Sequence, residues 1–327
     1  MTSSTPSFED SLYSLGPVRR IERWLSAMPH PPLAVEIATT HVATARWGRV
    51  RGHLESSAVE YLSEGSFSPS PVEPNIPNAD AIRGALRRVF QKVPHRGAPL
   101  ALLIPDPVVR VFILPFENLP RRADEALPLL RWRLKKSVPF DVEETVVSWM
   151  RQRGREGNLE IIAAIARQRI VREYEEIIET LGAHAGVVLS STLITLPLLE
   201  DRGSTLLVRL SGRSLTTVIV QSGRLCVYRS TEMASGVAAL EPQAILDEIF
   251  PALAYFQDTS GGTVDRVRLS GFGGREEIVR AALAAELSCS VSPLASAEGA
   301  LALDSGAKGL IQQNVEPLVG WMMNGGS

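Results

Sequence analysis

Residues 33–46 read LAVEIATTHVATAR, and residues 205–221 read TLLVRLSGRSLTTVIVQ. Each stretch is an apolar run, a short polar turn and a second apolar run, which is typical of two buried strands joined by a tight turn. The two stretches begin about 170 residues apart, and self-similarity at a long separation indicates a duplicated unit. The pair of stretches therefore predicts an α/β fold with two lobes.

The composition is that of an ordinary globular protein. The 327 residues are 45% hydrophobic and 21% charged, and this length suits two domains or one bilobal domain. The formal net charge of −2 gives no reason to expect nucleic acid as a partner. No apolar stretch is long enough to cross a bilayer, and residues 1–15 lack the basic start and apolar run of a secretion signal. We therefore expect a cytoplasmic protein that reaches a membrane through a partner or a surface patch.

Outside the two quoted stretches, the hydrophobic pattern alternates between strands and helices. Pro128 lies inside one predicted helix, which it should kink or shorten. The tail from Asp304 is mostly polar and contains glycine. The predicted helices cover residues 18–28, 79–92, 122–137, 168–181, 243–257 and 276–287. The further predicted strands cover residues 52–61, 100–104, 108–114, 144–152, 159–166, 225–229 and 264–270.

The order and spacing of several motifs resemble the PilM family of type IV pilus assembly proteins, relatives of FtsA with an actin-like core. Residues 34–40 are similar to the family's first phosphate loop, and residues 269–274 (LSGFGG) to its adenosine loop. Residues 119–125 and 138–140 resemble the family's Leu-Pro motif, acidic helix start and Pro-Phe pair. The resemblance covers about residues 33–303. It implies two ribonuclease-H-like lobes with an inserted strand-helix-strand-strand module.

The hydrophobic pattern and the resemblance together predict a division of the chain into four segments. Residues 1–30 would form an N-terminal tail and amphipathic helix, and residues 31–99 the first actin-like lobe. Residues 100–182 would form the inserted, partner-binding module, and residues 183–327 the second actin-like lobe.

The nucleotide site that the resemblance implies departs from the family pattern at its charged positions. Glu36 replaces Asp, Ala38 replaces Gly, and Arg209 stands where a carboxylate should organise Mg²⁺. A guanidinium repels Mg²⁺, although it can attract a phosphate directly. Losing such charge stabilisation slows phosphoryl transfer by about a hundredfold or more. The cofactor-binding positions of this site would be Glu36, Thr39, Thr40, Gly212, Gly271, Gly273 and Gly274.

We therefore expect a pseudo-ATPase with no required cofactor, in which nucleotide binding without turnover stays open. The same threonines and glycines are also typical of plain turns. Other chemistry has little support, because the five histidines lack metal-ligand spacing and neither a Walker A loop nor a G-x-S-x-G motif is present. Cys226 and Cys289 lie on apolar segments without CxxC spacing, which favours core positions and a reducing compartment. No catalytic residue and no metal site are predicted.

The resemblance implies a PilN-like partner, a bitopic inner-membrane protein whose cytoplasmic N-terminal tail lies in a groove beside the inserted module. Our candidate groove residues are Leu103, Ile104, Val111 and Ile113, with a place in the core as the alternative. A pilus motor ATPase is a further candidate partner. The chain would then lie at the inner face of the inner membrane, held there by its partner.

Residues 121–136 are noticeably basic, since six arginines and lysines outnumber Asp124 and Glu125. Such a face fits solvent, an anionic membrane surface or an acidic partner. The resulting hypothesis is a scaffold that links a cytoplasmic pilus motor to PilN-like and PilO-like proteins. The alternative is a nucleotide-binding actin-like ATPase or switch of a pilus, secretion or cell-division system, in which Glu36 and Arg209 compensate for each other.

Overall fold

The computed structural model describes residues 30–48, 53–63, 65–297, 300 and 303–324. The helix predicted at residues 18–28 therefore lies outside the described residues. Within the described ranges, no helix is both long and apolar enough to cross a bilayer.

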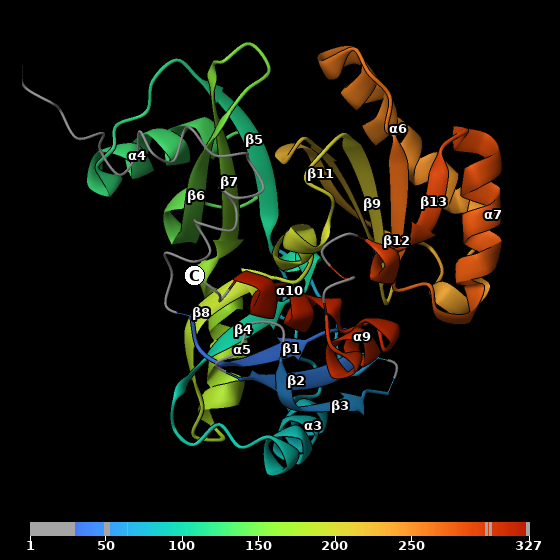
Figure 1. Ribbon diagram of the computed structural model, residues 1–327. Coiled ribbons are helices and arrows are strands. Elements are labelled where there is room, and N and C mark those ends of the chain that lie inside the picture. The colour runs from blue at the N-terminus through green and yellow to red at the C-terminus, as the bar shows by residue number, and fades with distance from the viewer. Residues whose placement is uncertain (1–29, 49–52, 64, 298–299, 301–302, 325–327) are drawn as a thin grey trace, which may run out of the picture.

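The first of the two quoted stretches forms the centre of a five-stranded sheet (Figure 1). The strand order is β3-β2-β1-β4-β8, in which β1 to β3 are antiparallel and β4 and β8 are parallel to β1. Helices α3 (Ala79–Lys92) and α5 (Gln168–Glu179) pack on one face of this sheet. The five strands are β1 (Leu33–Ile37), β2 (His41–Trp47), β3 (Leu54–Tyr61), β4 (Pro99–Ile104) and β8 (His184–Ser190).

The second quoted stretch forms an equivalent sheet with the order β11-β10-β9-β12-β13. Its first three strands are antiparallel and its last two are parallel to β9, as in the first sheet. Helices α6 (Pro242–Ser260) and α7 (Glu276–Leu287) cover its outer face. The strands are β9 (Ser204–Ser211), β10 (Ser214–Gln221), β11 (Arg224–Glu232), β12 (Arg266–Ser270) and β13 (Ser290–Pro293). The duplication confirms the predicted two-lobed, actin-like α/β fold.

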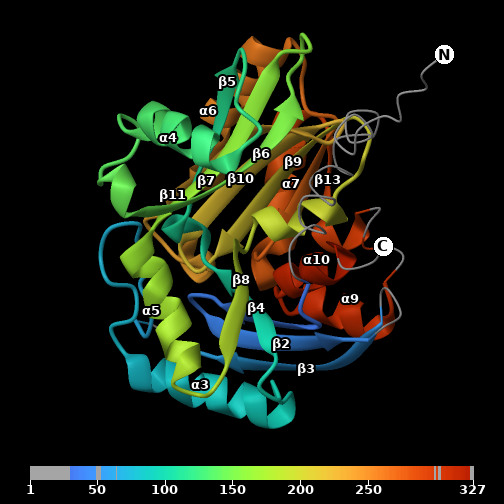
Figure 2. The same ribbon diagram turned by 90° about the vertical axis from the view of Figure 1, so that its left-hand side faces the viewer.

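A third sheet, of three antiparallel strands, projects from the first lobe (Figure 2). Its order is β5-β7-β6, from β5 (Arg110–Phe116), β6 (Thr145–Arg153) and β7 (Leu159–Arg167). Helix α4 (Ala123–Leu134) packs on one face of it and runs through Pro128. We call this unit the inserted module.

The sheets divide the chain differently from the boundaries predicted at residues 100 and 183. β4 pairs in parallel with β1, with Leu102 opposite Val35, and β8 pairs with β4. α5 packs on the first lobe through Ile170 and Tyr174. These segments belong to the first lobe because their apolar residues fill its core. The inserted module is therefore shorter than predicted and extends from β5 to β7.

The tail from Asp304 is not the polar extension that the sequence indicates. It forms α9 (Ser305–Gln312) and α10 (Glu316–Asn324), which pack between the lobes. Trp321 is fully buried, stacks on His30 at 3.9 Å and donates from Nε1 to the carbonyl oxygen of Pro31 at 3.0 Å. One apolar cluster joins α10 to residues of both sheets, including Ala34 and Leu207.

Short 3₁₀ helices complete the described structure. They are η1 (Asp106–Val108), η2 (Val142–Glu144), η3 (Leu193–Leu198), η4 (Val237–Ala239), η5 (Gly273–Arg275) and η6 (Leu294–Ser296).

Candidate functional site

The two turns that the sequence predicts as phosphate loops meet beside one buried arginine. Arg209 lies on β9, two residues before the turn that begins at Ser211. Its Nε donates to Glu316 Oε1 at 2.6 Å, and its Nη2 donates to Glu36 Oε1 at 3.3 Å. Asp106 Oδ2 lies 3.7 Å from Arg209 Nη1. Three buried carboxylates, from β1, η1 and α10, thus surround one guanidinium.

The three carboxylates around Arg209 keep its guanidinium group positively charged. Burial alone lowers the pKa of Arg209, but Glu316, Glu36 and Asp106 together outweigh burial and raise the pKa above its ordinary value. The guanidinium therefore stays protonated, and its positive charge offsets part of the negative charge of the carboxylates that the first lobe and α10 direct toward it.

Asp106 is the second centre of this cluster. Its Oδ1 accepts hydrogen bonds from Ser190 Oγ at 2.6 Å and Thr192 N at 2.8 Å, and from Tyr228 OH at 3.1 Å. Its Oδ2 accepts from Thr216 Oγ1 at 2.9 Å and from the Thr192 hydroxyl. Ser190 and Thr192 belong to the first lobe, whereas Thr216 and Tyr228 belong to the second. Both oxygens of Asp106 therefore accept several hydrogen bonds, and these bonds link the first lobe to the second.

The first predicted phosphate loop touches the second. Gly212 has φ +61°, and a Cβ built on it would lie 2.9 Å from Thr39 Cβ. Glu36 is fully buried, and its Oε2 lies 3.5 Å from His41 Nε2. The Thr40 hydroxyl lies 3.1 Å from the other ring nitrogen of His41. The structure thus places Thr39 against Gly212, while Glu36 contacts Arg209 two residues before the second turn.

These residues do not fit a Mg²⁺-bound phosphate. Such a group needs carboxylates facing the metal and glycine backbone open to the anion. Here the Arg209 guanidinium fills the space among the carboxylates, and Thr39 covers Gly212. In the described part of the chain, no group of three or more His, Cys, Asp or Glu side chains is arranged to hold a metal ion.

The glycines of the predicted adenosine loop differ in the space around them. Gly271 has φ +85°, and a Cβ on it would lie 1.8 Å from the carbonyl oxygen of Leu210, so close approach of backbone to backbone requires glycine there. Gly273 and Gly274 have no atom within 4 Å of such a Cβ. Gly271 is therefore explained by packing, while Gly273 and Gly274 border open space.

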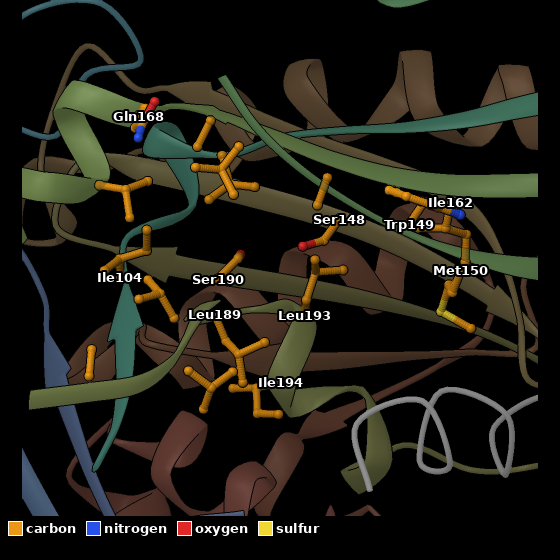
Figure 3. A pocket seen from close by; sticks show the side chains of 18 of the residues that line it. Ile104, Ser148, Trp149, Met150, Ile162, Gln168, Leu189, Ser190, Leu193 and Ile194 are labelled. Carbon is orange, nitrogen blue, oxygen red and sulfur yellow. The ribbon is translucent and has the colours of Figure 1, made fainter. Parts of the chain in front are cut away.

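A separate apolar groove lies between the first lobe and the inserted module (Figure 3). Its volume is about 610 Å³. β8 and η3 form one wall and β6 and β7 the other, with α5 at one end. The apolar lining includes Val146, Met150, Ile162, Leu189 and Leu193.

The groove contains an open strand edge. β8 is the last strand of the first sheet and pairs with β4 on one side, and β6 is the last strand of the module. No other described strand pairs with the second edge of β8. Free backbone N–H and C=O groups beside apolar side chains are the arrangement to which an extended peptide adds as a further strand.

The four predicted groove residues lie in different places. Ile104 lines the groove, at the end of β4. Leu103 is fully buried in the core between the lobes. Val111 and Ile113 lie on β5, partly buried against that core, and Val111 also borders a second cavity of about 430 Å³ beside β11.

Sequence reasoning missed Asp106 and Glu316 in the cluster and most of the groove. Asp106 stands between two prolines directly after β4, which is buried from Leu100 to Ile104, and this placement is typical of an inward-facing carboxylate. Glu316 gave no local signal, because its partners are remote in the sequence. The β8 residues of the groove lie in an apolar stretch for which the sequence analysis predicts no strand.

No protein-family model and no curated protein matches the sequence. Among solved structures, the chain is similar to a PilM-PilN type IV pilus biogenesis complex, with 17% identity over 91% of this chain and 100% of that one, at a TM-score of 0.73. A Bacteroides thetaiotaomicron protein with an actin-like ATPase fold and unknown function is 12% identical over 82% and 92% of the two chains, with a TM-score of 0.45. The cytoplasmic domain of EpsL, from the Vibrio cholerae type II secretion system, is 11% identical over 72% and 80%, with a TM-score of 0.44. At 17% identity, the likeness to the first structure establishes the fold.

Proposed function

We propose that this chain is a PilM-like scaffold of a type IV pilus assembly machine, which binds the extended cytoplasmic tail of a PilN-like inner-membrane protein. The observation that carries the proposal is the open edge of β8 inside an apolar groove. The likeness in fold to a PilM-PilN complex agrees with it, because the alignment spans the whole of that chain. Such a scaffold would lie at the inner face of the membrane and leave its other surfaces to a motor ATPase.

The groove favours an extended peptide with apolar side chains at alternate positions. Successive side chains of a strand point to opposite faces, so a strand paired with β8 would direct every second side chain toward the apolar wall formed by Val146, Met150 and Ile162. Burying one large aliphatic or aromatic side chain contributes about 1.5–3 kcal/mol. Two or three such anchors plus backbone pairing, less the cost of ordering the peptide, correspond to a dissociation constant of about 1 μM.

The test is fluorescence polarisation with a labelled N-terminal tail peptide of the PilN-like protein from the same genome. We expect saturable binding, and Val146→Asp should weaken it about tenfold or more because the peptide would bury the new carboxylate. Val146 is 45% exposed, so the substitution leaves the core intact. The matched control is Ile278→Asp on α7, a branched aliphatic residue that is 54% exposed and lies outside the groove.

Two results would contradict the proposal. One is the absence of any polarisation change with the wild-type chain at micromolar concentrations. The other is equal binding by the Val146→Asp and Ile278→Asp variants, which would place the peptide elsewhere.

We further propose that this binding needs no ATP turnover. The support is the Arg209 guanidinium among Glu36, Asp106 and Glu316, which links the lobes through side chains where an actin-like ATPase uses a metal-bound phosphate. The dissociation constant of the peptide should therefore be the same with and without Mg²⁺ and ATP.

A further inference from the structure

The outer face of α4 combines exposed apolar side chains with positive charge. Trp132 is 73% exposed, more than any other large hydrophobic side chain in the described ranges, and Leu129, one turn earlier, is 43% exposed. Residues three or four positions apart are neighbours on a helix, so Arg133 lies beside Leu129. Lys135 and Lys136 follow directly after Leu134, the last residue of α4. α4 lies at the outer margin of the inserted module (Figure 1).

The acidic residues at the start of α4 are already paired. Arg122 Nη2 lies 2.7 Å from Asp124 Oδ2, and Arg122 Nε lies 3.3 Å from Glu125 Oε1. In contrast, Arg133, Lys135 and Lys136 are exposed and form no ion pair with any described residue. The positive charge of this end of the helix is therefore available to an anionic partner. We call Leu129, Trp132, Arg133, Lys135 and Lys136 the α4 face.

The α4 face is separate from the peptide groove. On β7, Ile161, Ala163 and Ile165 pack against α4, whereas Ile162 and Ala164 line the groove. Alternate residues of a strand point to opposite faces, so the module's sheet stands between the two surfaces. Both can be occupied at the same time.

We propose that the α4 face binds an anionic phospholipid surface. The indole and the leucine would enter the interface between headgroups and acyl chains, while the ammonium and guanidinium groups contact phosphates. A projecting indole on a convex helix suits a fluid surface, which needs no complementary shape. An acidic protein would have to supply a pocket for Trp132, and a free phosphate would make no use of Trp132 or Leu129.

The test is flotation of the full chain with vesicles of phosphatidylcholine, with and without phosphatidylglycerol. We expect binding only to the anionic vesicles, and weaker binding at high salt because the exposed charges are screened. One basic residue near an anionic surface contributes about a fivefold factor in partition, so Lys135→Gln/Lys136→Gln should lower partition about 30-fold. Trp132→Ser should lower it about tenfold through lost apolar burial.

The matched control is Arg87→Gln/Arg202→Gln, which removes two exposed cations remote from α4 and should leave partition unchanged. Two outcomes would overturn the proposal: flotation that persists in both α4 variants, and a wild-type chain that fails to float with anionic vesicles. In the second case, an acidic protein is the partner that fits the same charges. Peptide binding in the groove should be equal in all these variants. A negative flotation result would therefore leave the proposed scaffold function untouched, and a negative peptide-binding result would leave the proposed lipid binding untouched.

Discussion

Arg209 is one positive charge among three buried carboxylates, in a region that water does not reach. Removing one partner of a buried ion pair usually costs about 3–5 kcal/mol, because the remaining charge is left without compensation. The cluster therefore makes the stability of the folded chain depend on Arg209.

We expect Arg209→Met to lower the free energy of unfolding by about 3–5 kcal/mol in urea denaturation. Arg209→Lys should recover only part of this loss, because one ammonium group cannot contact Glu36, Asp106 and Glu316 together. The control is Arg213→Met, which breaks an exposed ion pair with Glu232 and should change stability by about 0–1 kcal/mol. Similar effects at both positions would show that the cluster has no special role.

At the scale of elements, α10 depends on a close approach to η3. A Cβ on Gly320 would lie 2.0 Å from the carbonyl oxygen of Ile194, so the two backbones leave no room for a side chain. Gly309 in α9 is a helical glycine around which a Cβ would meet no atom within 4 Å. The two positions form a matched pair of helix glycines that differ in packing.

Gly320→Ala should destabilise the chain by about 1–3 kcal/mol, because α10 must move away from η3. Gly309→Ala should stabilise it by about 0.5–1 kcal/mol, since alanine loses less conformational freedom in a helix. Thermal denaturation of both variants measures the difference. A destabilised Gly309→Ala variant, or a neutral Gly320→Ala variant, would contradict the packing described here.

Elements with a strong local pattern could be predicted from the sequence. For α3 the predicted and observed bounds agree, because Ile82, Leu86 and Val89 form one apolar face and Asn78 caps the helix by accepting from Ala81 N at 3.1 Å. α10 gave no such signal, since it is buried nearly all round by η3, β1 and β2 rather than along one stripe. Its burial follows from contacts with residues remote in the chain.

For the molecule as a whole, the decisive measurement concerns nucleotide. Isothermal calorimetry with ATP and Mg²⁺ should give no saturable heat, because side chains already link the lobes through Arg209 and Asp106. One observation supports the alternative hypothesis of a nucleotide switch: the space around Gly273 and Gly274 is open. Micromolar binding that is lost in Gly273→Val would support that switch and contradict our expectation.

The candidate site could be predicted only in part, and the reason is geometric. Glu36 and Arg209 each depart from the family pattern that the sequence resembles, but their ion pair joins residues 173 positions apart and depends on how the lobes close. Asp106 and Glu316 join the same cluster from segments with no repeat and no motif. The groove likewise forms where the module meets the first lobe, so no single stretch of sequence encodes it.

The open edge of β8 has a consequence for handling the protein. Unpaired strand edges are templates for any extended chain, including another copy of the same protein. Native proteins usually protect such edges with charge, proline or a covering element, yet the partly exposed part of β8 offers alanine, glycine, valine and leucine. The solubility of the protein at high concentration should therefore rise when a bound peptide pairs with this edge.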